Sequence, residues 1–183
     1  MKKERINEIW GIFFLLLGLF TLTSLFYFHS KDISFYTSHP AVPVQNVTGI
    51  TGAYLAFGLR IAFGLSSFLI PALFLLWSGC FFLQRVPERK FFKFIGLAIA
   101  LFSTSTIIAI SSPVSTRFEE GGAVGYIAGS HLLRYFGFAG SYIIAGSCLL
   151  LALLLATDFL IFPMVKKFAA RLDRKSTRLN SSH

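Results

Sequence analysis

Few residues in this sequence have the type and position that chemistry requires, and Asp158 stands out among them. It is the one charged residue within the long apolar stretches of the chain, about one helical turn from the end of the last stretch. A carboxylate inside a membrane can mark a proton or ion pathway. The alternative is that Asp158 snorkels toward the headgroups or pairs with Lys166 or Lys167, and its place near the edge favours that alternative.

The other candidate groups form no recognisable catalytic or metal-binding pattern. The histidines are scattered, and the two cysteines lie in apolar stretches without metal-ligand spacing. The adjacent glutamates are more typical of a solvated loop than of an acid and base pair. We therefore assign no catalytic residue, no cofactor and no metal. The side chains considered are His29, His39, His131, His183, Cys80, Cys148, Glu119 and Glu120.

Four apolar stretches dominate the sequence, at residues 9–28, 61–83, 94–110 and 138–162. Each is close to the 20 or so residues that a helix needs to cross a hydrocarbon core. A composition of 55% hydrophobic and only 14% charged residues excludes an ordinary soluble domain. Inside lipid every backbone polar group must be satisfied within its own segment. The sequence therefore predicts an all-α integral membrane protein with four transmembrane helices.

Basic residues flank these stretches unevenly, which predicts the topology. Ten lie before the first stretch, between the second and third, or after the fourth, and four lie in the other two connections. Because positive residues stay on the cytoplasmic side, we expect two hairpins with both termini and the middle loop in the cytoplasm. The ten are Lys2, Lys3, Arg5, Arg85, Arg89, Lys90, Lys93, Lys166, Lys167 and Arg171, and the four are Lys31, Arg60, Arg117 and Arg134.

The two outer loops carry the same spacing of glycines. These are Gly49, Gly52 and Gly64 in the first loop and Gly122, Gly125 and Gly137 in the second, with intervals of three and twelve residues in both. The pattern predicts a repeated unit, made of a span out, an outer loop, a glycine-framed segment and a span back. Chance coincidence among the 15 glycines is the alternative.

The segment between Gly122 and Gly137 in the second outer loop has the pattern of a short helix. Residues 124–136 place apolar side chains along one side and Ser130, His131 and Arg134 toward the other. Such a helix suits the outer membrane interface. The alternative is that this segment simply begins the fourth span.

Further glycines and a proline are candidates for helix packing. Gly121, Gly125 and Gly129 recur at four-residue spacing, which lets two helix backbones approach closely. Pro71 lies in the middle of the second stretch, where we expect it to kink the helix near Ser66 and Ser67. These residues predict a packing role and not catalysis.

The last eleven residues, 173–183, differ in character from the rest of the chain. Their sequence, DRKSTRLNSSH, resembles the in-frame translation of a sequencing adapter. A genuine polar, disordered C-terminus is the alternative. We expect a native four-span domain over residues 1–172, a non-native tail over 173–183, and a natural protein that continues past Leu172.

The order of these features resembles a known family. A basic N-terminus and four spans are combined with the motif N-x-x-G-x-x-G-A-Y-L-A in the first outer loop and G-G-A-V-G in the second. Over residues 8–162 this arrangement resembles the N-terminal four-span region of bacterial FtsK/SpoIIIE DNA translocases. The matching residues are Asn46, Gly49, Gly52, Ala53, Tyr54, Leu55, Ala56, Pro71, Gly121, Gly122, Val124 and Gly125.

The resemblance implies a multi-pass anchor in the bacterial inner membrane, at the division septum. It implies that this region helps a hexameric ATP-driven DNA motor to oligomerise and to reach the division site, in cell division and chromosome segregation. Expected partners are the lipid bilayer, further copies of the chain and other division proteins, whereas DNA and ATP would bind only to the motor. No Walker lysine motif precedes Leu172, so we expect this fragment not to be an enzyme.

A small transporter or channel subunit is the competing class. Asp158, Pro71 and the repeated hairpins motivate it. It predicts a polar path through the bundle.

Overall fold

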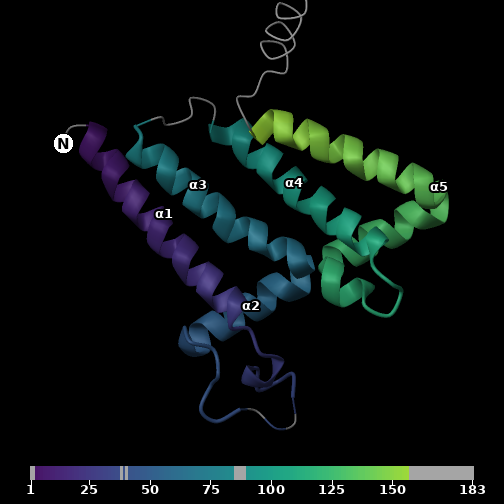
Figure 1. The fold of residues 1–183 in the computed structure, drawn as a ribbon, viewed down its shortest axis with the longest axis horizontal. Helices are drawn as coiled ribbons and strands as arrows, with labels where there is room; N and C mark the ends of the chain where they lie inside the picture. The colour runs from purple at the N-terminus through teal and green to yellow at the C-terminus, as the bar shows by residue number, and fades with distance from the viewer. Residues whose placement is uncertain (1–2, 38, 40, 85–89, 157–183) are drawn as a thin grey trace, which may run out of the picture.

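The computed structural model describes residues 3–37, 39, 41–84 and 90–156, and every regular element in this part of the chain is helical (Figure 1). This confirms the predicted all-α class. The elements, in chain order, are α1 (Lys3–Phe26), the 3-10 helix η1 (Ser30–Asp32), α2 (Gly49–Phe63), the 3-10 helix η2 (Gly64–Phe68), α3 (Leu69–Phe82), α4 (Lys90–Ser111) and α5 (Arg117–Ala156).

Four helical stretches are long and apolar enough to cross a membrane, as the sequence predicted. The second and fourth begin earlier than the apolar runs 61–83 and 138–162, because the glycine-framed segments before those runs are helical and apolar too. The four stretches are Glu4–Phe26, Gly49–Phe82, Lys93–Ser111 and Arg117–Leu155.

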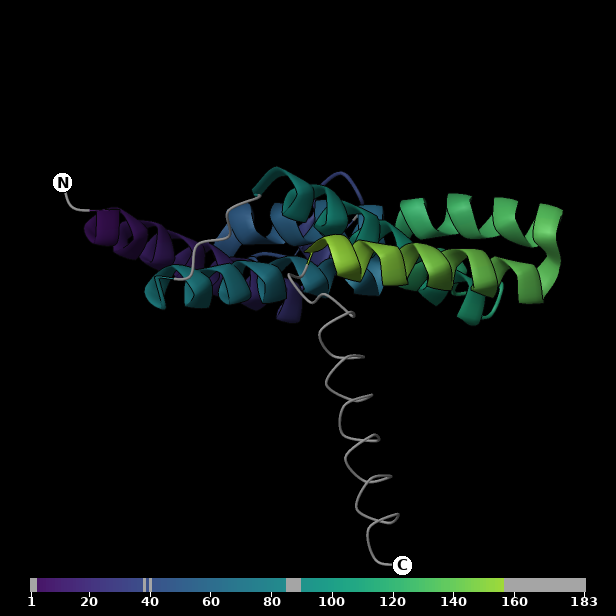
Figure 2. The ribbon, with the colours of Figure 1, turned by 90° about the horizontal axis from the view of Figure 1, so that it is seen from above.

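The helices form two hairpins that lie next to each other (Figure 1). In the first hairpin α1 packs along α3, with α2 crossing at their far end. In the second hairpin α4 packs along α5, and α5 turns back on itself. Seen from above, the helices lie in a flat, elongated layer (Figure 2). Such a layer leaves much apolar helix surface without a partner inside the chain, as is expected of helices that face lipid or other chains.

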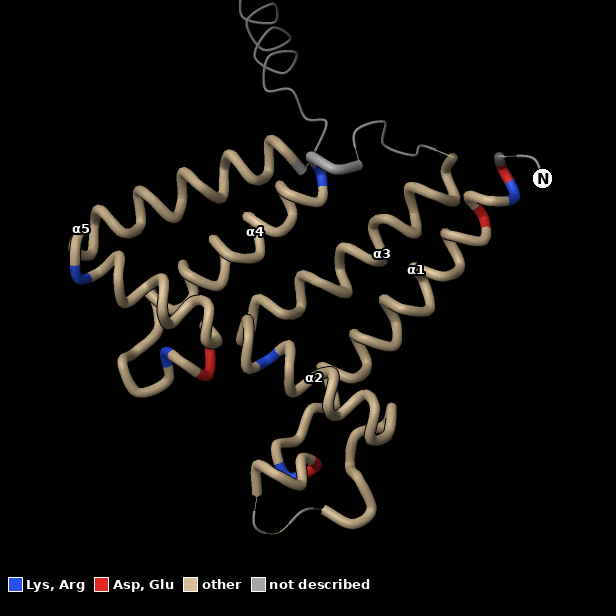
Figure 3. The backbone as a smooth tube through the Cα atoms, turned by 180° about the vertical axis from the view of Figure 1, so that it is seen from behind, with Lys and Arg blue, Asp and Glu red and all other residues tan. Residues whose placement is uncertain are grey.

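Charged residues lie toward the ends of α1, α2 and α4, in the outer loops and at the start and the bend of α5, and the long sections between these places are free of charge (Figure 3). A carboxylate, ammonium or guanidinium group in the hydrocarbon core costs several kcal/mol, by order of magnitude. The arrangement therefore suits helices that cross a bilayer.

Close approach of α1 and α3 depends on small residues. A methyl group added at Gly18 would lie 3.0 Å from Leu75, and one at Gly11 would lie 3.3 Å from Phe82. The hydroxyl of Ser78 donates a 2.8 Å hydrogen bond across the interface to the backbone carbonyl of Gly11. Small residues at helix contacts and hydroxyl bonds between helices are the usual means of association in lipid.

The irregularity in the second stretch lies just before Pro71 and not at it. The break is the 3-10 segment η2, and Pro71 is the third residue of α3. A proline in the first turn of a helix costs little, because the backbone N–H that it lacks would have had no helical partner there. The second stretch is therefore interrupted near Ser66 and Ser67, where the kink was expected, and Pro71 lies in the first turn of the helix that follows.

Helix α5 is interrupted twice. Gly122 has φ 67° and ψ 178°, and Gly137 has φ 63° and ψ −172°, conformations that lie outside the helical region. This part of conformational space is open essentially to glycine alone. Residues 123–136 are therefore a separate short helix, as the amphipathic pattern predicted, and not simply the beginning of the fourth span.

Candidate functional site: a glycine and serine junction in the outer segments

The first outer loop is organised around the buried carboxylate of Asp32. One carboxylate oxygen accepts a 2.8 Å hydrogen bond from the backbone N–H of Gln45, and the other accepts a 2.9 Å bond from that of Asn46. Hydrogen bonds to an ionised group are stronger than those between neutral groups. Asp32 therefore holds the two ends of the loop together.

Asn46 and Thr48 then fix the start of α2 against the end of α1. The amide of Asn46 donates a 2.9 Å bond to the backbone carbonyl of Ser24, and its oxygen accepts a 3.0 Å bond from the N–H of Thr48. The hydroxyls of Ser24 and Thr48 are 2.8 Å apart. A methyl group at Gly52 would overlap Thr48 and lie 2.6 Å from the Ser24 hydroxyl.

The second outer segment repeats this arrangement on α4. The hydroxyl of Ser105 donates a 2.5 Å hydrogen bond to the carbonyl of Gly121. Gly121 precedes Gly122 in the second segment, just as Thr48 precedes Gly49 in the first. A methyl group at Gly125 would overlap the backbone of Ser105. Each unit therefore has a serine on the preceding span that touches both the start of the segment and the glycine three residues into it.

The two segments also end alike. Gly64 and Gly137 both have positive φ, and a buried serine hydroxyl donates to the carbonyl of each. Ser67 donates to Gly64 over 2.6 Å, and Ser141 donates to Gly137 over 2.5 Å. All four positive-φ glycines of the described chain are the framing glycines, namely Gly49, Gly64, Gly122 and Gly137.

The end of the first segment meets the start of the second. A methyl group at Gly64 would overlap the backbone of Glu120 and lie 2.6 Å from the nitrogen of Gly122. One at Gly122 would overlap the nitrogen of Gly64 and lie 2.6 Å from the carbonyl oxygen of Ala62. We call this contact the glycine junction. It joins the two hairpins, and neither position has space for a side chain.

The remaining framing glycines have no such contact. A methyl group at Gly49 or at Gly137 would meet no atom within 4 Å. At these two positions an added side chain would therefore meet open space within one chain.

The glycines at four-residue spacing all face α4. A methyl group at Gly121 would lie 2.5 Å from the Cβ of Ala109, and one at Gly129 would lie 3.4 Å from the same atom. The break at Gly122 separates Gly121 from the helix that carries Gly125 and Gly129, so they do not form one continuous stripe.

The residues singled out for chemistry are not brought together. Asp158, Lys166, Lys167, residues 85–89 and the tail 173–183 lie outside the described residues. Glu120 accepts a 2.6 Å hydrogen bond from Ser112, and His131 lies 2.8 Å from the carbonyl of Ile127 in its own helix. Within the described ranges no three His, Cys, Asp or Glu residues are grouped so that they could hold a metal ion.

Sequence reasoning missed Asp32, which it passed over as one polar residue of an irregular loop. It also missed Gly11 and Gly18, whose seven-residue spacing brings both to one side of α1. That spacing was a usable signal. The bonds of Asp32 to residues 45 and 46 had no comparable signal, because they depend on how the loop folds back.

Comparison with known proteins extends these observations. The family described as "4TM region of DNA translocase FtsK/SpoIIIE" matches residues 3–169. The DNA translocase FtsK of Rickettsia prowazekii is 28% identical over 84% of this chain and 20% of its own length. That of Caldanaerobacter subterraneus is 29% identical over 95% of this chain and 24% of its own length. The chain thus spans about a fifth to a quarter of these relatives. No solved structure matches it.

Proposed function

The chain belongs to the 4TM region of the FtsK/SpoIIIE family of DNA translocases, and we propose that it is the membrane anchor of such a translocase in cell division and chromosome segregation. The observation that carries the proposal is the set of four apolar helices, which the family match covers almost from end to end. A membrane segment of this size holds an attached domain far more firmly than a lipid chain or a surface helix.

The proposal assigns DNA and ATP to a motor that would follow the fourth span, in a protein whose native four-span domain is residues 1–172. The matched relatives bear the name DNA translocase, and their matched parts are about a fifth of their length. In the same proposal residues 173–183 are not native, and the anchor also promotes oligomerisation and reaches the division septum through other division proteins.

Three successive hydroxyls in the middle of α4 favour an anchor over a transporter. Thr104 donates to the carbonyl of Ala100 and Thr106 to that of Phe102, both within the helix, and Ser105 donates to Gly121. These donors are used for structure, whereas a transport site needs polar groups free to face a substrate.

A fusion of residues 1–172 to a fluorescent protein, expressed in a dividing rod-shaped bacterium, tests the proposal. We expect membrane fluorescence with a band at mid-cell. Fluorescence spread evenly over the membrane, as for an unrelated four-span fusion used as the control, would refute targeting to the septum. Fluorescence in the cytosol would refute the anchor itself.

A second fusion tests the link to DNA movement. Residues 1–172 would replace the four-span region of a relative's translocase, and rescue of chromosome segregation would be scored. We expect rescue, and loss of rescue when the first hairpin is deleted from the fusion. Equal segregation with and without the hairpin would contradict a role for the anchor.

A further inference from the structure

We infer that copies of this chain bind each other head to tail, with the Gly137 end of one copy seated on the Gly49 end of the next. The inference rests on the proposed function, since it names the partner with which the anchor would oligomerise. It starts from the glycine junction, which shows how the end of one segment binds the start of another.

The glycine junction is a contact between the two glycine-framed segments, which we take as the equivalent units of the predicted repeat. The separation in sequence between Gly49 and Gly122 is the same as that between Gly64 and Gly137, so one shift in residue number relates both pairs. In the junction the end of the first unit lies against the start of the second. The same relation, applied once more, places the end of the second unit against the start of the first unit of another copy.

The same shift in residue number identifies the residues of the two copies that would be in contact. Glu120, which lies against Gly64 in the junction, corresponds to Val47. Ala62 and Phe63, which lie against Gly122, correspond to Tyr135 and Phe136. The proposed contact therefore sets Tyr135, Phe136 and Gly137 of one copy against Val47 and Gly49 of the next.

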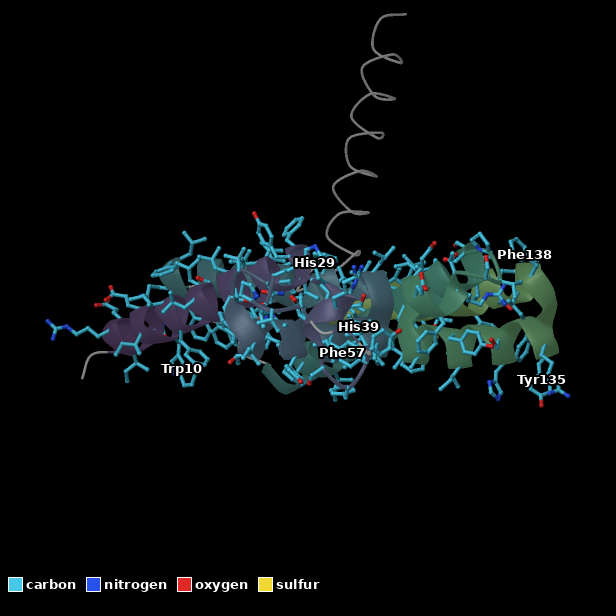
Figure 4. The ribbon with its side chains drawn as sticks, turned by 90° about the horizontal axis from the view of Figure 1, so that it is seen from below. Trp10, His29, His39, Phe57, Tyr135 and Phe138 are labelled. Atoms are coloured by element: carbon cyan, nitrogen blue, oxygen red, sulfur yellow. The ribbon has the colours of Figure 1, made fainter. Side chains whose placement is uncertain are left out.

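These surfaces are uncovered within one chain. The exposed fractions are 68% for Val47, 71% for Tyr135 and 57% for Phe136. Figure 4 shows Tyr135 and Phe138 at one extremity of the molecule. By contrast Gly64, Ser66 and Ser67, at the covered end of the first segment, are all buried. Exposed aromatic residues of this kind are typical of contact surfaces.

The placement of the two units fits a repeating contact. They follow one another along the flat layer, so the uncovered start of α2 and the turn at Gly137 lie toward opposite sides of the molecule (Figures 1 and 2). The relation seen in the junction runs in one direction, from the end of one unit to the start of the next, so the proposed contact between copies is heterologous and not two-fold. A head-to-tail contact leaves one free end at each step and closes into a ring when the rotation allows.

Disulfide cross-linking in native membranes tests the inference. The two native cysteines, Cys80 and Cys148, are first replaced by serine. Val47→Cys and Phe136→Cys are then placed on separate chains with different tags, which are expressed together and oxidised. We expect a cross-linked dimer that contains both tags and is lost when either variant is expressed alone. Leu16→Cys with Leu151→Cys, two exposed positions on the spans, is the matched control.

A chain with both Val47→Cys and Phe136→Cys adds a second readout. A head-to-tail contact gives cross-linked species larger than a dimer, whereas a two-fold contact stops at a dimer. Both substitutions are at exposed positions, so the fold should tolerate them. Tyr135→Cys repeats the test one residue away if the Phe136 variant is poorly expressed.

The outcomes separate this inference from the proposed function. If differently tagged chains purify together but the mixed pair gives no cross-link above the control pair, the head-to-tail contact is wrong and an oligomeric anchor stands. If the tagged chains do not purify together at all, oligomerisation fails as well. Cross-linking of Val47→Cys to itself would replace the head-to-tail contact with a symmetric one.

Discussion

Gly64 and Gly122 lie so close together that a methyl group on either would overlap the backbone beside the other. Both have positive φ, so their conformation and their surroundings each require glycine. The two hairpins of the chain are therefore in main-chain contact, where even the smallest side chain would push them apart.

Replacement of Gly122 by alanine should destabilise the protein by at least about 1–3 kcal/mol, the typical cost of a non-glycine residue in this backbone region. The overlap with Gly64 would add to that cost. Gly58→Ala is the matched control, because Gly58 is helical and has no neighbour within 4 Å of an added methyl group. The midpoint of SDS-induced unfolding measures both. Equal midpoints for the two variants would contradict the glycine junction.

The Asp32→Asn substitution should loosen the first outer loop. The carboxylate accepts two backbone hydrogen bonds, and an amide keeps just one acceptor oxygen and brings an N–H₂ group toward the other donor. A buried donor left unsatisfied costs about 1–3 kcal/mol. Hydrogen exchange at Gln45 and Asn46 should rise, while exchange in α4 is unchanged. Glu119→Gln, at an exposed position, is the control and should leave the loop as it is.

Loss of the Ser78 hydroxyl should weaken the contact between α1 and α3. Its bond to Gly11 crosses the helix interface, and bonds of this kind are worth about 0.6 kcal/mol on average and up to about 1.7. Ser147→Ala is the control, because Ser147 donates to Ile143 in its own helix. Unfolding measurements in detergent should show a loss for Ser78→Ala only. A larger loss for Ser147→Ala would contradict this account of the interface.

Labelling should place the outer segments and the N-terminus on opposite sides of the membrane. In a chain without native cysteines, Val114→Cys should react with a membrane-impermeant maleimide added to intact cells, since Val114 is exposed between α4 and α5. Glu4→Cys should react only after the cells are opened. The reverse pattern would refute the topology predicted from the positive charges.

The sequence was sufficient for those parts of the fold that depend on local pattern. Hydropathy located four spans because each must be apolar along its whole length. The glycine frames predicted a repeated segment, and four of these glycines form its bends, because glycine adopts positive φ without steric cost. Residues 124–136 were predicted as a short helix from their amphipathic pattern, and Gly137 ends the helix that they form.

The contacts between segments were beyond the reach of local pattern. Asp32 bonds to residues 45 and 46, and Ser24 touches Thr48, and neither pairing follows from spacing along one element. An interruption near Ser66 and Ser67 was predicted from Pro71, but its form was not, because the 3-10 segment begins at Gly64 and Pro71 lies in the first turn of α3. The contact between Gly64 and Gly122 needed the arrangement of both hairpins.

The position of the glycine junction has a mechanical consequence. Most contacts between the hairpins involve α2 and η2 with α4 and α5, and these elements lie at the end of the bundle opposite to the N-terminus (Figure 1). In our proposal a motor would pull on the chain beyond α5, from the side where α1 begins. Part of that force would pass along α5 and through the glycine junction to the first hairpin, so the junction would carry load between the hairpins.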